Sequence, residues 1–465
     1  MSEILPREEA VSRNPKLRSA LHRFAESAIE EATGHFRDPA ELPEQWTMRI
    51  EPSEPNTLRW RRELTVDWYE VARSATKQTR TLEAFKEAQA SIQEDAAASR
   101  HFTGLVHVPG MAYRMEIDEC LSKFLGDLLA EAGALRLAPD AFSRSYARLE
   151  EFFYSDRVRM RALAPLQRFS MDLSEVGLGD QLRIIQLPVS ERERSMSEAM
   201  RTHLAGWPQL PGSETCALEL LWEVRKHVRD ADDAMDISEN LDPTRELFDQ
   251  TLSALRLLRA GAVGCQYRVF EALSFTGFGR FGLRTTQSSP LGSTYRLSAE
   301  EVPSLRSLWN HLAERSGSAS GRLGTAIARF NSTYDRVRPE DRIIDLTIAL
   351  EALLMTDNDQ QELSYRLALR GAALLGDAPD QRERLFRDLK NLYHVRSRLA
   401  HGCSLAKATR KRVPAADLGK YLEGAEDLVR SAIVRFLSLV GTRRETDIPE
   451  LLDKWILTGR YGASG

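Results

Sequence analysis

Residues 380–402 read DQRERLFRDLKNLYHVRSRLAHG, and this stretch decides the fold class of the last third of the chain. Its apolar residues recur at helical spacing, and Gly402 is a typical helix stop. Asp380 and Glu383 have the spacing of a capping box, so we expect Asp380 to be the N-cap. The stretch therefore predicts one long, unbroken helix that ends near Gly402.

Three further helical segments lie around this helix in the sequence. Residues 341–355, DRIIDLTIALEALLM, are apolar on nearly all sides apart from Asp345 and Glu351, so this helix should be buried. A second helix is expected at 362–375 and a last one at 415–440. Four helices with short connections are typical of a helix bundle.

Upstream of the bundle, the hydrophobic pattern changes character. Residues 15–155 mix charged and apolar side chains at helical spacing. Runs rich in β-forming residues follow at 160–190 and 263–297, with a helical stretch at 244–259 between them. This order predicts an α+β multidomain protein.

The Ser/Gly-rich residues 316–321 have the composition of a flexible linker. We therefore expect a mainly helical N-terminal region at 1–155, a small mixed α+β region at 156–315 and an all-α helical bundle at 322–465. Trp46, Trp60 and Trp68, in the N-terminal region, could stack on bases, but isolated tryptophans are usually core anchors, and we expect them in the core.

The composition argues against several classes of protein. The 465 residues carry a formal net charge of −4, which is not the basic surplus of a dedicated nucleic-acid-binding protein, so any RNA contact must be local. The four cysteines lie far apart without a C-x-x-C pair, which predicts reduced thiols and suggests neither a zinc cage nor a disulfide framework. We expect no metal and no cofactor.

The sequence also bears on location. The amino terminus is acidic and lacks the apolar core of a secretion signal. The apolar stretch at 433–440 is short and interrupted by Arg435, so no membrane span is expected. These features predict a cytoplasmic protein.

Three segments of the bundle together resemble the ApeA-like branch of the HEPN superfamily: DRIIDLTIALEALL at 341–354, LSYRLALRGAALL at 363–375 and LYHVRSRLAHG at 392–402. This branch has an apolar helix with Asp or Glu, a helix opening L-x-x-R-x-A, and a helix end with Arg, a short spacer and His-Gly. The resemblance covers roughly residues 335–440. It implies a HEPN ribonuclease with an R-x4-6-H motif, in which Arg396 and His401 are the catalytic pair.

The spacing of the motif alone does not select this pair. Four places in the chain satisfy it: Arg100 with His107, Arg306 with His311, Arg387 with His394, and Arg396 with His401. Only Arg396 and His401 stand at the end of the third bundle helix. Arginine and histidine there could also serve to cap the helix carbonyls and complement the helix dipole.

The helix period raises a further difficulty. At about 100° per residue, Arg396 lies about 140° from His401, whereas His394, Ser397 and Arg398 lie within about 80° of it. The pair therefore requires a distorted helix end or an arginine that reaches around the helix. We expect Arg398 to be an auxiliary phosphate contact.

These residue types suit RNA cleavage without metal. Histidine transfers protons near neutral pH, and arginine binds phosphate oxygens with two parallel hydrogen bonds. One histidine per chain cannot be acid and base at once, so the homodimer usual in this superfamily would let two His401 side chains share one cleft. The expected products are a 2′,3′-cyclic phosphate and a 5′-hydroxyl.

Charge around the motif favours an RNA partner. Residues 382–412 hold ten Lys or Arg and two acidic residues, a net charge of +8. Such a run attracts a phosphate backbone, although it could also be a solvated helix face. The expected auxiliary RNA contacts are His394, Ser397, Arg398, Lys407, Arg410, Lys411 and Arg412.

Two hypotheses follow. The first is an RNA endonuclease that acts as a toxin-like effector in bacterial antiphage defence, as the resemblance implies, with residues 1–315 sensing a phage-derived trigger or restraining activity. The second is a non-catalytic HEPN module for dimerisation or nucleic-acid binding.

Overall fold

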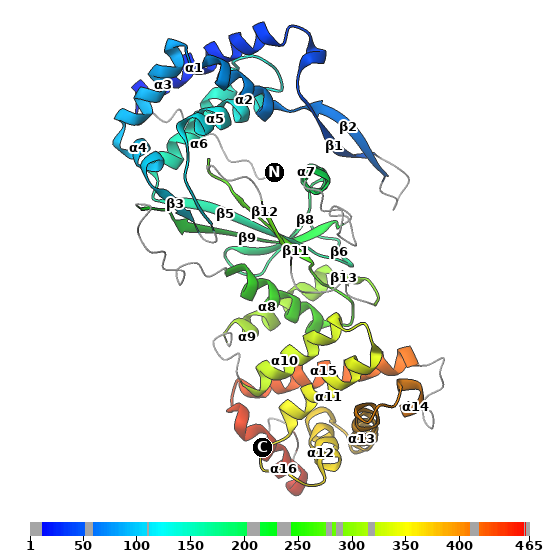
Figure 1. Cartoon of the computed structure of the whole chain (residues 1–465). Helices are drawn as coiled ribbons and strands as arrows, with labels where there is room; N and C mark the ends of the chain where they lie inside the picture. Colours follow the sequence, from blue (N-terminus) through cyan, green and yellow to red (C-terminus); the bar gives the residue numbers. More distant parts are fainter. Residues whose placement is uncertain are drawn as a thin grey trace.

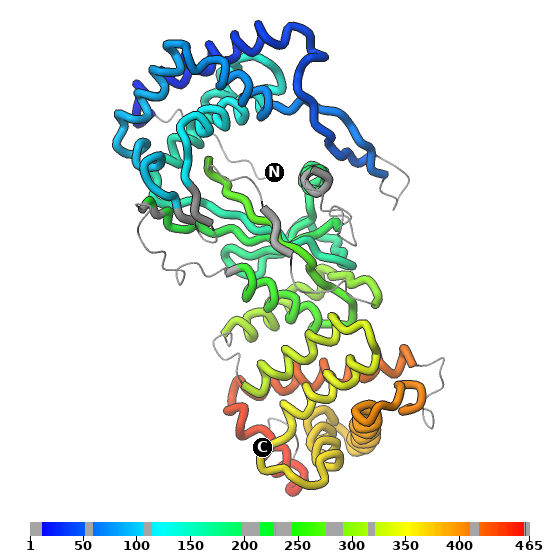
Figure 2. The backbone as a smooth tube through the Cα atoms, viewed as in Figure 1, coloured from blue at the N-terminus to red at the C-terminus, as the bar shows by residue number. Residues whose placement is uncertain are grey.

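The computed structural model describes residues 12–51, 59–108, 111–201, 214–229, 243–275, 281–284, 292–314, 321–409, 418–459 and 461. Figure 1 shows helices at both ends of an elongated molecule and a β-sheet between them. The chain passes from one helical end through the sheet to the other (Figure 2). The α+β organisation predicted from the sequence is thereby confirmed.

The N-terminal part is mainly helical, but it also contains strands that the sequence pattern did not predict. Its helices are α1 (Pro15–His35), α2 (Trp68–Thr79), α3 (Glu83–Glu94), α4 (Ala96–Thr103), α5 (Ile117–Ala132) and α6 (Pro139–Tyr154). Strands β1 (Glu44–Glu51) and β2 (Arg59–Val66) form an antiparallel ribbon, and β3 (Leu105–Val108) pairs with β4 (Met111–Tyr113) and β10 (His227–Arg229). Phe24, Phe124 and Phe152 are fully buried in the core of this part.

The middle part is built on a six-stranded antiparallel sheet with the order β12-β11-β5-β9-β8-β7. The strands are β5 (Arg157–Pro165), β7 (Glu175–Gly177), β8 (Leu182–Gln186), β9 (Cys216–Arg225), β11 (Tyr267–Ala272) and β12 (Phe281–Arg284). Strands β6 (Phe169–Met171) and β13 (Tyr295–Leu297) form a separate parallel pair. Because β9 joins β5 to β8, it holds the two halves of the sheet together.

The two faces of the sheet differ in chemistry. On one face Ile184 and Leu218 share a core with α8 (Pro243–Leu258) and α9 (Val302–Ala313). On the other face the Arg161 guanidinium is 2.7 Å from a carboxylate oxygen of Glu219 and 3.1 Å from one of Glu191. Glu191 belongs to α7 (Val189–Arg201), so ion pairs hold this helix against the sheet.

The C-terminal part is helical. It contains α10 (Arg322–Ser332), α11 (Pro339–Leu354), α12 (Leu363–Leu375), α13 (Pro379–Ala400), α14 (Leu405–Thr409), α15 (Leu418–Val440) and α16 (Ile448–Thr458). Short 3₁₀ helices lie at Pro39–Glu41, Ala299–Glu301, Thr333–Asp335 and Glu445–Asp447. Leu346, Leu350 and Leu353 of α11 are fully buried, as its apolar sequence predicts.

The middle and C-terminal parts share one hydrophobic core, which extends from the sheet through α8 to α11 and α15. A buried polar cluster crosses the junction: Arg256 of α8 lies 4.3 Å from the ring centre of Tyr334, and Nε of Arg430 donates to the Arg256 carbonyl at 2.8 Å. The linker predicted at 316–321 lies, apart from Gly321, outside the described residues.

Candidate functional site

Helix α13, which carries the predicted site, begins two residues earlier than expected, because its N-cap is Ala378 and not Asp380. Pro379 is its first residue, and the N-cap Ala378 makes no side-chain hydrogen bond to the helix. The capping box predicted for Asp380 and Glu383 is therefore wrong. The reason is that proline, with its fixed φ and missing N–H, is well suited to the first helical position.

The inner face of α13 is apolar and buried, with Leu389, Leu392, Val395 and Leu399 in the core. The outer face carries a row of exposed basic side chains: Arg384, Arg387, His394, Arg398 and His401, which we call the α13 basic stripe. Successive members are three, seven, four and three positions apart, and such positions share one face of a helix. The stripe extends for roughly 25 Å along the helix.

The stripe has few opposing charges. The sequence has no acidic residue from 389 to 416. Arg387 has an exposed ion pair with Glu383 at 3.0 Å. In the described part of the chain, Arg384, His394 and His401 form no ion pair and no side-chain hydrogen bond. Their hydrogen-bonding groups are therefore free to contact a ligand.

His401 marks the end of α13. It is the C-cap, and its backbone N–H donates to the Ser397 carbonyl at 3.2 Å. Gly402 follows with φ +83°, the left-handed conformation that glycine adopts readily and that ends many helices. The imidazole of His401 is exposed at this corner.

Arg396 lies on a different side of α13 from the stripe. Its Nη2 is 3.7 Å from Oε2 of Glu351 on α11, its side chain is 30% exposed, and its buried Nε has no hydrogen-bond partner among the described residues. No hydrogen bond or ion pair joins Arg396 to His401 within the described residues. Because α13 stays helical through Ala400, its last turn does not unwind to bring the two together.

Glu351 is absent from the site predicted by sequence, although the pattern contained a signal for it. It is the only acidic residue in the second half of an otherwise apolar helix. Burial raises the pKa of Glu351, and the positive charge of Arg396 opposes that rise. Burial and the Glu351 charge also raise the pKa of the Tyr393 hydroxyl, which completes this small cluster.

The other acidic residue in the body of α11, Asp345, has a structural role. Its buried carboxylate is 3.2 Å from Nη1 of Arg329 and 2.8 Å from Nε of Arg336. Two arginines therefore neutralise it, and it does not approach the stripe through any described hydrogen bond or ion pair.

Arg398 has a partner within the chain. Its Nη1 donates to the carbonyl of Ala408 at 3.0 Å, near the end of α14. The start of the same short helix is bound by Glu340, whose Oε1 accepts from the Leu405 N–H at 3.1 Å. Arg398 thus positions α14 beside the helix end, and Arg398 as a whole is exposed.

The remaining predicted contacts are distributed around this helix end. Ser397 is partly buried, and Lys407 is exposed on α14. Arg410, Lys411 and Arg412 lie outside the described residues.

Arg306 and His311, another pair with the spacing of the motif, both make contacts that stabilise the fold. On α9, Nε of Arg306 donates to the Gly177 carbonyl at 2.8 Å, and a His311 ring nitrogen lies 2.7 Å from the Ser307 carbonyl. These contacts tie α9 to the sheet region and fix the histidine to its own helix. His394 and Arg387, another such pair, belong to the α13 basic stripe.

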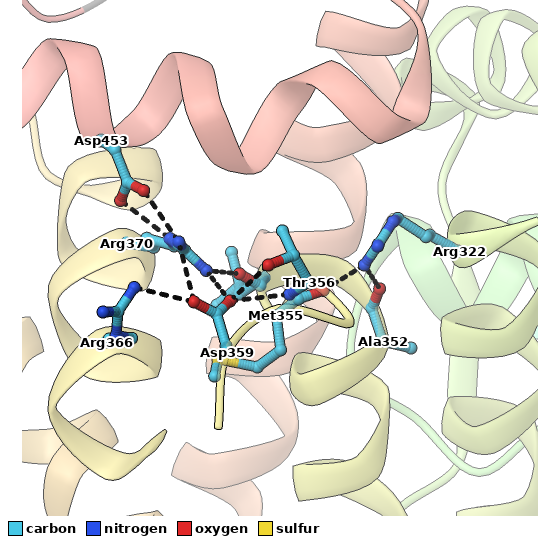
Figure 3. A network of polar contacts seen from close by, with 9 residues as sticks. Arg322, Ala352, Met355, Thr356, Asp359, Arg366, Arg370 and Asp453 are labelled. Atoms are coloured by element: carbon cyan, nitrogen blue, oxygen red, sulfur yellow. Dashed lines mark hydrogen bonds and ion pairs between the residues drawn. The ribbon is translucent and has the colours of Figure 1, made fainter. Parts of the chain in front are cut away.

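A buried ion network supports the bundle behind α13. Figure 3 shows Arg370 of α12 between Asp359 and Asp453, with two hydrogen bonds of 2.8 Å to the latter carboxylate. Burial alone would raise the pKa of Asp359, but hydrogen bonds from Arg370 and Thr356 lower it to about 2. Arg366, from the L-x-x-R-x-A opening of α12, also donates to Asp359 at 2.8 Å.

Comparisons with known proteins add no relative: no family model, curated protein or solved structure matches this chain. Among the helices that the structure describes, none is long and apolar enough to cross a membrane. The described residues contain no group of three His, Cys, Asp or Glu side chains that could hold a metal ion.

Proposed function

We propose that the C-terminal part is a metal-independent RNA endonuclease of the HEPN type. The α13 basic stripe is the observation that supports this best. It presents arginines and histidines on one exposed helix face, and it ends at His401. An anionic polymer bound along it would release counterions and bring one phosphate to that histidine.

Arg396 supplies the phosphate clamp in this proposal. A guanidinium has five N–H donors, and within the described residues Arg396 uses none of them in a hydrogen bond. Its loose pairing with Glu351 holds the side chain in place and leaves donors for phosphate oxygens. Arginine keeps its charge throughout, so it stabilises the phosphorane and does not act as the base.

The separation of Arg396 from His401 within one chain favours a site shared by two copies. His401 of one copy would take the proton of the 2′-hydroxyl as its oxygen attacks phosphorus. His401 of the other copy, protonated, would give a proton to the departing 5′-oxygen. The P–O5′ bond breaks, and the products are a 2′,3′-cyclic phosphate and a 5′-hydroxyl.

The biological setting follows from the HEPN resemblance. We place the nuclease in bacterial antiphage defence as a toxin-like effector in the cytoplasm. Residues 1–315 would sense a phage-derived trigger or restrain the nuclease until it arrives. The hydrophobic core that joins the sheet to the bundle would transmit a change in the middle part of the chain to the nuclease.

A second candidate function is a non-catalytic HEPN module for dimerisation or nucleic-acid binding. The observation that favours it is the same separation: in one chain, Arg396 contacts Glu351 while His401 caps the helix. A module of this kind would bind RNA through the stripe and leave it uncut.

The decisive experiment compares RNA ends in cells that express the wild-type chain, His401→Ala, Arg396→Ala or His311→Ala. We expect new 5′-hydroxyl and 2′,3′-cyclic phosphate ends with the wild type and His311→Ala, and their loss with the other two. His311 is a matched control because it is also exposed on a helix.

Each of the other possible results favours a different function or a different catalytic residue. Identical ends in all strains, with and without phage infection, would refute the nuclease proposal. Retained cleavage in His401→Ala, together with lost cleavage in an additional His394→Ala strain, would assign the proton transfer to the other histidine of the stripe. RNA binding without cleavage by purified wild type would favour the non-catalytic module.

A further inference from the structure

The ribbon of β1 and β2 at the N-terminal end has an exposed apolar face. Trp46 and Leu64 stand directly opposite each other in the register, and they are 53% and 45% exposed. Opposite residues of a pair share one face, and Met48 and Ile50 continue it along β1. The expectation that Trp46 is a core anchor is therefore wrong.

Helix α7 covers the outer edge of β1. The Met48 N–H donates to Oγ of Ser197 at 2.8 Å, and the Ile50 N–H donates to Oε1 of Glu193 at 2.8 Å. These backbone groups would otherwise be open to another strand. One edge of the ribbon is therefore occupied by side chains of this chain.

The hydrogen bonds from Met48 and Ile50 to α7 also show which backbone groups of β2 point away from β1. In an antiparallel pair, residues whose N–H groups point away from the partner strand stand opposite residues that do the same. Met48 is opposite Arg62, Ile50 is opposite Trp60, and the alternation continues to Leu64. The N–H and C=O groups of Trp60, Arg62 and Leu64 therefore point outward from β2. This outer edge of β2 pairs with no other described strand.

The free edge carries positive charge. Arg59, Arg61 and Arg62 are exposed. Arg61 has one loose ion pair with Glu51, at 3.9 Å, and the other two form none within the described residues. Arginines on an edge strand prevent pairing with an identical edge, because like charges would meet. A second copy of β2 is therefore a poor occupant.

We propose that the outer edge of β2 binds an extended acidic segment of a partner protein, which adds as a third strand. The outward N–H and C=O groups would pair with its backbone, apolar side chains on one face would extend the apolar face beside Leu64, and acidic side chains on the other face would meet Arg59 and Arg61. A peptide backbone matches this row of donors and acceptors, and a nucleic-acid backbone does not.

This docking site does not depend on the nuclease, so it can be tested by binding alone. The probe is a fluorescein-labelled peptide of four Val-Glu repeats, which matches the eight residues of β2. We expect the full-length chain to bind it, and the double variant Arg59→Glu/Arg61→Glu, which reverses the charge on the face that its glutamates would meet, to bind it at least about tenfold more weakly. Arg37→Glu, an exposed arginine outside the ribbon, is the control and should bind as the wild type does.

Two altered peptides test the mode of binding. A peptide with N-methyl groups at alternate positions cannot pair along one edge and should not bind, and a Val-Lys repeat should be repelled. Equal binding of either peptide, or no binding of Val-Glu at about 1 mM, would overturn the proposal. Binding of an oligouridine in place of the peptide, with loss in the double variant, would instead make the ribbon a nucleic-acid surface. Unchanged circular dichroism of the variants shows that they are folded.

Discussion

At Glu351, a partly buried carboxylate lies beside Arg396, and burial raises its pKa. A raised pKa means that the fold favours the neutral acid, so the ionised group costs stability once the pH exceeds its ordinary value. The nearby arginine offsets only part of this cost. Side chains that reduce the stability of the fold are expected at functional sites, where their role in function outweighs that cost.

We therefore predict that Glu351→Gln separates stability from activity. The amide resembles the neutral acid, so at pH 7 the variant should melt at the wild-type temperature or slightly above it. At about pH 4, below the raised pKa of Glu351, the wild-type carboxyl is neutral as the amide is, and the two melting curves should converge. RNA cleavage should fall about tenfold in kcat, because Arg396 loses the charge that holds it.

Asp345→Asn is the matched comparison on the same helix. This carboxylate is buried and bound by Arg329 and Arg336, so the variant should lose thermal stability but keep the kcat of the folded enzyme. Wild-type kcat in Glu351→Gln would show that Glu351 does not position the arginine.

Arg370 and Arg366 bind the same carboxylate, but their burial differs. The Arg370 side chain is 4% exposed and that of Arg366 is 47% exposed. Arg370→Met would leave Asp359 buried without its main partner, and we predict a loss of about 3–5 kcal/mol in urea unfolding. Arg366→Met should cost less than about 1 kcal/mol, because its ion pair is solvated. Equal losses would show that burial does not set the strength of these bonds.

The low pKa of Asp359 predicts acid sensitivity. Hydrogen bonds hold this pKa at about 2 in the folded chain, below its value in the unfolded chain. The resulting stability is present above about pH 4 and is lost as the pH falls through the folded value. The urea midpoint should therefore drop between about pH 4 and pH 2, and Asp359→Asn should show a smaller drop over the same range. An identical drop in the variant would assign the acid sensitivity to other carboxylates.

At the scale of elements, the bounds of a helix could be predicted closely where the sequence itself contains a helix stop signal. The helix expected at 362–375 is observed at Leu363–Leu375, and the one expected at 380–402 is observed at Pro379–Ala400. Strand β9 was missed. The first half of CALELLWEVR is buried at every position, so the alternation that reveals a strand is absent.

The candidate site could be predicted only in part. The helix period already placed Arg396 and His401 on different sides of α13, and the structure has that arrangement. The pairing of Arg396 with Glu351 could not be predicted, because it depends on how α11 packs against α13. Exposure of Trp46 could not be predicted either, since apolar residues indicate burial only when another element covers them.

The α13 basic stripe predicts a weakened RNA contact when its charges are removed. Arg384→Gln/Arg387→Gln should raise KM about tenfold near 0.1 M salt and leave kcat unchanged, because these residues lie away from His401. The dependence of affinity on salt should also become shallower. Arg435→Gln, which removes an exposed charge from α15, should leave KM unchanged. A lower kcat with unchanged KM would show that the stripe does not bind substrate.

At the scale of the whole molecule, the two surfaces lie at opposite ends. The β1–β2 ribbon belongs to the N-terminal end and α13 to the C-terminal end (Figure 1). Side-chain hydrogen bonds join the ribbon to α7, ion pairs join α7 to the sheet, and a continuous core joins the sheet to the bundle. A ligand at one end can therefore act on the other only by shifting packed elements.

The requirement for two copies gives the last prediction. If each cleavage needs His401 from both chains, mixing wild type with His401→Ala should inactivate mixed dimers as well as variant dimers. At equal amounts and random assembly, about a quarter of the wild-type activity should remain, whereas independent sites would leave about half. Chains are coexpressed, and their mass in solution is measured first. Dilution with His311→Ala should cause no loss. A linear decline with the fraction of His401→Ala would place a complete site within each chain, and Arg396 would then have to leave Glu351 to reach the histidine of its own helix.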